Sequence, residues 1–134
     1  METSPNLTEA PHLELTQFRK LSQLMGQQAL EGLLSTYFHD AHERIEKIAI
    51  AVRQEDAKAA ERAAHALKGS SGMLGLSRMA AICNNAEIEA ESGEVLRIAD
   101  LLPKMRAELT ELQQLMTSVV THSPEGLRKQ ADAQ

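Results

Sequence analysis

The chain has 134 residues, of which 43% are hydrophobic and 25% charged, as expected for one globular domain. Its formal net charge of −5 argues against a nucleic-acid-binding protein. No apolar stretch approaches the roughly 18 residues that would span a membrane. The polar, acidic N-terminus does not resemble a signal peptide, and a single cysteine cannot form an internal disulfide. We therefore expect a cytoplasmic protein.

The residue composition favours helices over strands. Only three residues are aromatic, namely Phe18, Tyr37 and Phe38. A small β-sandwich or barrel usually contains more aromatic and β-branched residues than this. The chain is instead rich in Ala, Leu, Glu and Gln, which are strong helix formers. The predicted fold class is therefore all-α.

Apolar residues recur at helical spacing in one short segment and four long ones. In chain order these segments are Leu13 to Met25, Leu30 to Val52, about 56–72, Leu76 to Ala90, and Leu102 to Val119. Each apolar stripe must be buried against the others. The pattern therefore predicts an antiparallel up-down four-helix bundle with a short additional N-terminal helix.

The two ends of the chain differ from its middle. Residues 1–12 include Pro5 and Pro11, and residues 121–134 have no sustained apolar period. We expect flexible tails on both sides of a domain that covers residues 13–120. Pro103 either begins the last helix or kinks it, and the sequence alone leaves both options open.

His65 is expected in the middle of a solvent-exposed helix face. At about 100° per residue, its near neighbours on that face are polar or glycine, and the apolar residues lie on the opposite side. These neighbours are Lys58, Glu61, Arg62, Lys68, Gly69 and Gly72. The pattern disfavours a buried histidine and favours an exposed imidazole.

Gly69 and Gly72 follow His65 by one and two helical turns. A glycine inside a helix costs about 1 kcal/mol relative to alanine. One reason to tolerate that cost is access, because without side chains there another protein's backbone can approach the imidazole. The alternative is that Gly69 simply ends the helix and that the glycines belong to a turn.

The charge near His65 is opposite in sign to that of the whole chain. Lys58, Arg62 and Lys68 against Glu61 give residues 58–68 a local charge of +2, whereas the chain carries −5. Such a patch around an imidazole suits an anion, with a phosphoryl group as the obvious candidate. The alternative is an ordinary solvated helix face.

The run His65-Ala66-Leu67-Lys68-Gly69-Ser70-Ser71, followed by Leu74-Gly75, resembles the signature of histidine-containing phosphotransfer (HPt) domains. These domains are four-helix modules of two-component phosphorelays. The apolar pattern from about Leu13 to Met116 extends the resemblance to most of the chain. Leu76 departs from the small residue that is common after the last glycine of the motif.

The resemblance implies roles for individual residues. His65 would accept a phosphoryl group from the aspartyl phosphate of one receiver domain and pass it to the aspartate of another. Lys68 would stabilise the phosphoryl charge, and Gly69 would leave room for the partner. A further set is expected to contact that partner: Lys58, Arg62, Gly72, Met73 and Glu87.

The resemblance also implies which groups other molecules supply. Mg²⁺ and the aspartate would belong to the receiver, so this chain would need no cofactor and no metal. It would be a phosphoryl carrier without kinase activity of its own. Its expected partners are response-regulator receiver domains and an upstream hybrid histidine kinase, with no nucleic acid and no membrane. We expect a monomer, because one bundle can bury its own apolar stripes.

Three other hypotheses remain from the sequence. The chain could be the C-terminal HPt portion of a hybrid sensor kinase, or a helical adaptor that binds receivers without chemistry. It could also be a metal-binding bundle that uses His39, Asp40, His42 and Glu43, although polar helix faces often carry such residues by chance.

Overall fold

The computed structural model describes residues 10–121, and all regular secondary structure in this range is helical. The helices are α1 (Leu15–Met25), α2 (Gln27–Arg53), α3 (Ala57–Met73), α4 (Ser77–Glu91), α5 (Val95–Ala99) and α6 (Leu102–Thr121). The predicted all-α class is confirmed. No helix within this range is long and apolar enough to cross a membrane.

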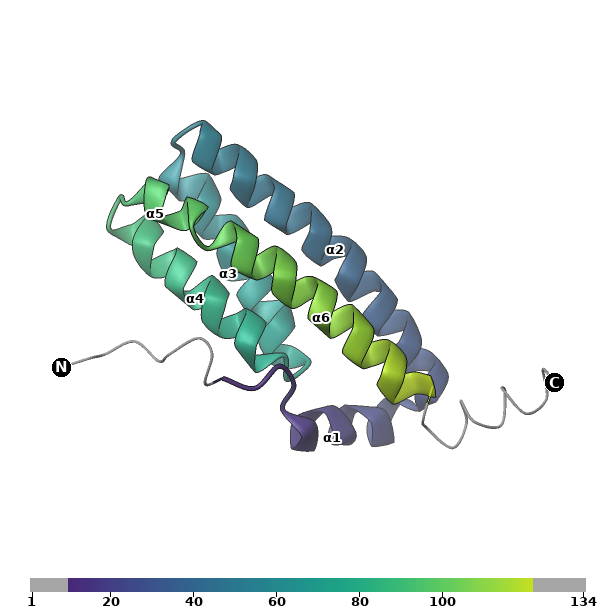
Figure 1. Cartoon of the computed structure of the whole chain (residues 1–134). Helices are drawn as coiled ribbons and strands as arrows, with labels where there is room; N and C mark the ends of the chain where they lie inside the picture. Colours follow the sequence, from purple (N-terminus) through teal and green to yellow (C-terminus); the bar gives the residue numbers. More distant parts are fainter. Residues whose placement is uncertain (1–9, 122–134) are drawn as a thin grey trace.

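The four long helices lie side by side along the length of the molecule (Figure 1). Among them, α3 packs most extensively against α4 and then against α2. The short helix α1 lies across the end where α3 turns into α4, and α5 connects α4 to α6 at the opposite end (Figure 1). Helix α3 is therefore held from two sides and keeps one face open to solvent.

The core explains why α3 can pack so closely against its neighbours. Its buried residues include Ala60 and Ala64, neither of which is measurably exposed, together with Leu67. Larger side chains from α2 and α4, such as Ile48 and Met79, belong to the same buried cluster as these alanines. Fully burying one such side chain stabilises the fold by about 1.5–3 kcal/mol.

Helix α3 has a defined start and continues past both of its glycines. The side chain of Asp56 caps its N-terminus by accepting a hydrogen bond of 3.0 Å from the backbone N–H of Ala59. The helix then continues through Gly69 and Gly72 to Met73. The alternative that Gly69 ends the helix is therefore wrong.

Pro103 begins the last helix and does not kink it. It is the second residue of α6, where a missing backbone N–H costs no intrahelical hydrogen bond. The separate short helix α5 occupies residues 95–99.

Contacts near the α3–α4 turn fix the end of α3. The buried hydroxyl of Ser71 lies 2.8 Å from the hydroxyl of Tyr37 on α2. Burial raises the pKa of Tyr37, so its phenol stays neutral. Gly75 adopts a φ of +77°, and an added Cβ there would lie 3.1 Å from the carbonyl oxygen of Glu14. The turn therefore requires glycine at this position.

Residues 10–12 are attached to the helices, although the sequence analysis places them in a flexible tail. The Nδ1 atom of His12 lies 2.8 Å from the buried carboxylate of Glu108 on α6. Arg78 on α4 donates to the carbonyl oxygen of Ala10 over 2.8 Å. The rest of the predicted tails, residues 1–9 and 122–134, lies outside the described residues, so the domain boundaries stay a prediction.

Candidate functional site

His65 projects from the middle of α3 into solvent. Its side chain is 71% exposed, as the helical periodicity predicts. Its Nδ1 atom lies 3.0 Å from Oε2 of Glu87 on the neighbouring helix α4. The contact with Glu87 therefore fixes the Nδ1 side of the ring, and the rest of the ring is exposed to solvent.

Glu87 joins His65 to Lys68. Only 12% of the Glu87 side chain is exposed, and its Oε1 atom lies 2.6 Å from Nζ of Lys68. Nζ of Lys68 also donates to Oδ1 of Asn84, at 3.4 Å. We call His65, Lys68 and Glu87 the triad. It combines two residues one turn apart on α3 with a carboxylate from α4.

The carboxylate of Glu87 is ionised at neutral pH. Burial alone would raise its pKa, but hydrogen bonds and charge attraction from Lys68 and His65 outweigh burial and hold it below the usual glutamate value. An ionised carboxylate can only accept hydrogen bonds. Nδ1 of His65 must therefore carry the proton that it donates to Glu87.

This hydrogen bond decides which nitrogen of His65 can react. A neutral imidazole with a proton on Nδ1 has its free lone pair on Nε2. In the triad, Nε2 belongs to the exposed part of the ring, where another molecule can reach it. The geometry therefore presents Nε2 as a nucleophile.

The triad also prepares the site for the charges that a reaction at Nε2 creates. When an electrophile binds Nε2, the ring becomes positively charged, and the carboxylate of Glu87 stabilises that charge. The ammonium group of Lys68, which has three N–H groups, forms an ion pair with Glu87 and donates one hydrogen bond to Asn84. The same ammonium group can donate a further hydrogen bond to an anion attached to His65.

The glycines beside His65 have no packing role. Both Gly69 and Gly72 are exposed, and an added Cβ at either position would meet nothing within 4 Å. The fold therefore has space for a side chain at both positions. Packing does not explain why these positions carry glycine, which destabilises a helix relative to alanine. This observation supports the interpretation that the glycines keep the surface near His65 accessible.

The structure separates the predicted site residues into two groups. It brings His65, Lys68 and Glu87 together, but it leaves Lys58, Arg62, Gly69, Gly72 and Met73 as exposed residues along α3. Glu87 is largely covered by the fold, and its carboxylate lies 3.0 Å from Nδ1 of His65 and 2.6 Å from Nζ of Lys68. Its contact with a partner stays a prediction.

The sequence analysis missed Asn84 as a member of the site. It precedes Glu87 by three residues and therefore lies on the same face of α4. That spacing is the signal that could have identified it, since a side chain one turn from Glu87 reaches the same lysine.

Two other candidate sites have different environments. Ligand atoms of His39, Asp40 and Glu43 lie within 4.8 Å of one another, but His39 and Glu43 are exposed and form an ordinary surface pair over 3.3 Å. His42 is not part of this group. Cys83 is buried, and burial raises the pKa of its thiol to about 12, so it is not an available nucleophile.

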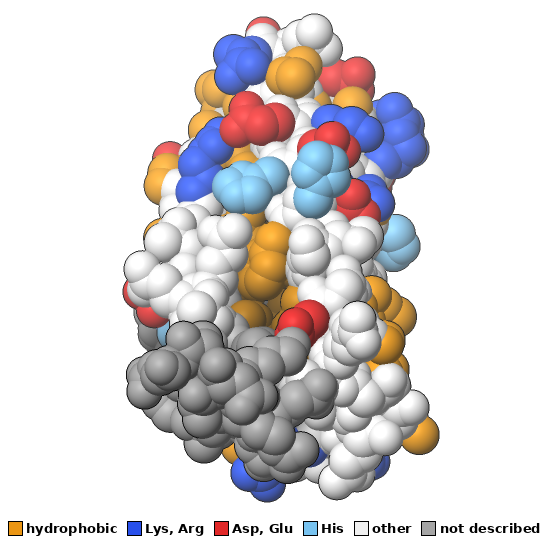
Figure 2. Space-filling model, turned by 90° about the vertical axis from the view of Figure 1, so that its right-hand side faces the viewer, with side chains coloured by type: hydrophobic (Ala, Val, Ile, Leu, Met, Phe, Trp, Pro, Cys, Tyr) orange, Lys and Arg blue, Asp and Glu red, His pale blue; other side chains and the backbone are white. Residues whose placement is uncertain are grey.

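One face of the molecule carries charges of both signs. On the face drawn in Figure 2, histidine, basic and acidic side chains gather next to one another, and a strip of hydrophobic side chains lies beside them. No field of a single sign covers this visible part of the molecule.

Comparisons with known proteins agree with this site. The model of the Hpt domain family matches residues 32–115, a range that contains the whole triad. The structure is similar to the crystal structure of histidine-containing phosphotransfer protein B from Pseudomonas aeruginosa PAO1. The TM-score is 0.78 and the identity 28%, over 84% of this chain and 97% of the other. A search of curated proteins gives no match.

We expect Glu87→Gln to destabilise the fold by about 1 kcal/mol at pH 7, because the variant loses the charge that pairs with Lys68. The pKa of Glu87 is lower in the folded chain than in the unfolded chain, so its contribution is complete above the usual glutamate pKa, about 4.3. It disappears as the pH falls through the folded value. The free energy of unfolding of both proteins between pH 7 and pH 3 measures this difference.

Glu111→Gln on the exposed surface of α6 serves as the control, because it removes one carboxylate in the same way without touching the triad. A difference between Glu87→Gln and the unchanged protein that stays constant over the whole pH range would contradict an ionised Glu87 in the folded chain.

Proposed function

The chain belongs to the Hpt domain family, and we propose that His65 is the residue on which it carries the phosphoryl group. Family membership makes it a histidine phosphotransfer protein of a two-component phosphorelay. The observation that carries the assignment of His65 is the hydrogen bond from its Nδ1 to buried Glu87, which leaves Nε2 exposed and nucleophilic.

The proposed transfer is a direct displacement at phosphorus. The lone pair on Nε2 of His65 forms the new bond to phosphorus while the bond from phosphorus to the receiver's aspartyl oxygen breaks. The aspartate leaves as a carboxylate. The imidazole, now positively charged, keeps its proton on Nδ1, and Glu87 stabilises it over 3.0 Å. The reverse sequence delivers the phosphoryl group to a second receiver.

Lys68 is proposed to bind the phosphoryl oxygens during this step. In phosphoryl transfer, charge spreads over the equatorial oxygens, and catalysis depends mainly on positioning and charge stabilisation. The ion pair with Glu87 and the hydrogen bond to Asn84 hold the ammonium group one helical turn from His65. A lysine fixed in this way loses little further entropy when the anion arrives.

The partner is proposed to supply the metal ion. Within the described residues, the carboxylate nearest to His65 is that of Glu87, and Lys68 and His65 already occupy it. Octahedral Mg²⁺ usually needs one or two free carboxylates. We therefore assign Mg²⁺ and the phosphorylated aspartate to the receiver domain, and we assign to this chain the role of a carrier without kinase activity.

The architecture that we propose is the antiparallel up-down four-helix bundle with a short N-terminal helix. Support comes from the lengthwise arrangement of α2, α3, α4 and α6 and from α1 across one end (Figure 1). We also propose that the protein is a cytoplasmic monomer whose domain covers residues 13–120. Its proposed partners are receiver domains and an upstream hybrid kinase, and it binds no nucleic acid. The same domain at the C-terminus of a hybrid kinase would use the same site.

We expect His65→Gln to accept no phosphoryl group from a phosphorylated receiver domain, because the glutamine amide lacks the nucleophilic lone pair. The fold should be unchanged, since the His65 side chain is 71% exposed. The measurement is transfer of an acid-labile, alkali-stable phosphoryl label, together with a thermal unfolding curve. His42→Gln, which changes another exposed histidine, should be labelled like the unchanged protein.

Continued labelling of His65→Gln would contradict the assignment of the acceptor. A folded protein with an accessible His65 that takes no label from any of several receivers would favour the adaptor that binds receivers without chemistry.

We expect Gly69→Gln to slow phosphoryl transfer about tenfold or more, because a side chain one turn from His65 keeps the receiver's aspartate out of reach. The fold should not suffer, since the new side chain meets open space and glutamine is a better helix former than glycine. Gly32→Gln in α2 is the matched control, because it too is an exposed helical glycine with open space around its Cβ position.

The measurements are the transfer rate and the melting temperature of both variants. Equal transfer rates for Gly69→Gln and the unchanged protein would show that the glycine does not serve access.

A further inference from the structure

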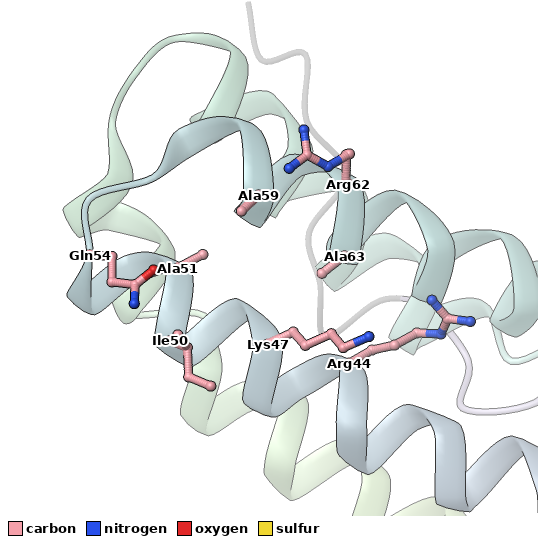
Figure 3. A pocket seen from close by; sticks show the side chains of 8 residues that line it. All are labelled: Arg44, Lys47, Ile50, Ala51, Gln54, Ala59, Arg62 and Ala63. Atoms are coloured by element: carbon pink, nitrogen blue, oxygen red, sulfur yellow. The ribbon is translucent and has the colours of Figure 1, made fainter.

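A positively charged groove lies between α2 and α3, on the side of α3 away from α4. Its volume is about 390 Å³. Arg44 and Lys47 line it from α2, and Arg62 lines it from α3. Figure 3 shows Arg44 and Lys47 extending along the side of α2 that faces α3, and Arg62 projecting from α3. We call this feature the α2–α3 groove.

The groove exists because small side chains line it where the two helices face each other. Ala51 of α2 and Ala59 and Ala63 of α3 leave space between the backbones (Figure 3). The groove therefore has an apolar floor, formed by these alanines, and three cationic side chains at its rim. A partner that fits needs carboxylates for the rim and short aliphatic groups for the floor.

The three cations have no acidic partner within the described part of the chain. None of Arg44, Lys47 and Arg62 forms an ion pair there, and no carboxylate lines the groove. Nε of Arg44 is buried without a hydrogen-bond partner. A buried donor without a partner costs stability. This concentration of positive charge occurs on a chain whose net charge is −5.

The groove lies next to His65. Arg62 precedes His65 by three residues, a rise of about 4.5 Å along α3. A stable protein interface covers about 800 Å² on each partner, which corresponds to a disc of roughly 16 Å radius. A partner that docks on His65 with an interface of this size therefore extends past Arg62, which lies at the edge of the groove.

We propose that Arg44 and Lys47 are specificity residues that select receiver domains with an acidic segment beside the phosphorylated aspartate. This proposal rests on the proposed function of His65. The occupant of the α2–α3 groove is that acidic segment, whose carboxylates pair with the cations while the alanines accommodate its backbone. Receivers with a neutral or basic surface at this position leave the cations unpaired and bind more weakly.

The test measures how transfer depends on the receiver concentration. The probe is a receiver domain that labels the unchanged protein, phosphorylated with acetyl phosphate and Mg²⁺. Variants Lys47→Glu and Arg44→Glu/Lys47→Glu are compared with Lys104→Glu, which reverses an exposed charge on α6. Lys47 is exposed and carries the test alone if the change at half-buried Arg44 lowers the melting temperature.

We expect the half-saturating receiver concentration to rise about tenfold in the double variant and several-fold in Lys47→Glu, because reversal turns exposed ion pairs into repulsions. The rate at saturating receiver should stay unchanged, since the triad is intact. Lys104→Glu should behave like the unchanged protein. The effect should shrink at high salt.

An unchanged half-saturating concentration in both groove variants would overturn the proposal while His65 labelling persists, so the proposed function would stand. The groove variants could instead lose binding of inorganic phosphate, which ³¹P line broadening detects, while their half-saturating receiver concentration stays unchanged. That result would identify the groove as a small-anion site and would also overturn the proposal. Loss of labelling in His65→Gln, by contrast, reports only on the acceptor.

Discussion

The ionised carboxylate of Glu87, buried between α3 and α4, is the constraint on which the site depends. A buried charge without partners would cost several kcal/mol, so the carboxylate must bind both Lys68 and His65. This requirement fixes two side chains one turn apart on α3. It fixes the proton of the imidazole as well, because the carboxylate accepts and Nδ1 must donate. The exposed nucleophile on Nε2 is the consequence.

The packing of α3 makes this arrangement possible. Alanines on its buried face let α4 approach closely enough for a glutamate to reach across to the histidine. The Tyr37–Ser71 hydrogen bond attaches the end of the same helix to α2. Phosphoryl transfer depends more on positioning than on covalent assistance from the protein, so a rigid helix with one prepared side chain is sufficient.

Much of the site could be predicted from periodicity along one helix. The exposure of His65 and its glycines depends only on their places on α3, and the helical pattern reports those places directly. The burial of Glu87 could not be predicted in this way, because it depends on how α4 rotates against α3. Its position four residues after Cys83, on the apolar side of α4, was the available hint. The α2–α3 groove and the attachment of His12 to Glu108 require contacts between distant segments, about which local patterns say nothing.

The most direct test of the account is to determine which nitrogen of His65 carries the phosphoryl group. Long-range ¹H–¹⁵N spectra of the ring, recorded before and after transfer from a phosphorylated receiver, distinguish the two nitrogens. We predict a proton on Nδ1 before transfer and a phosphoryl group on Nε2 afterwards, with the Nδ1 proton retained. A phosphoryl group on Nδ1, or a resting ring with its proton on Nε2, would contradict the role of Glu87 and with it the proposed mechanism.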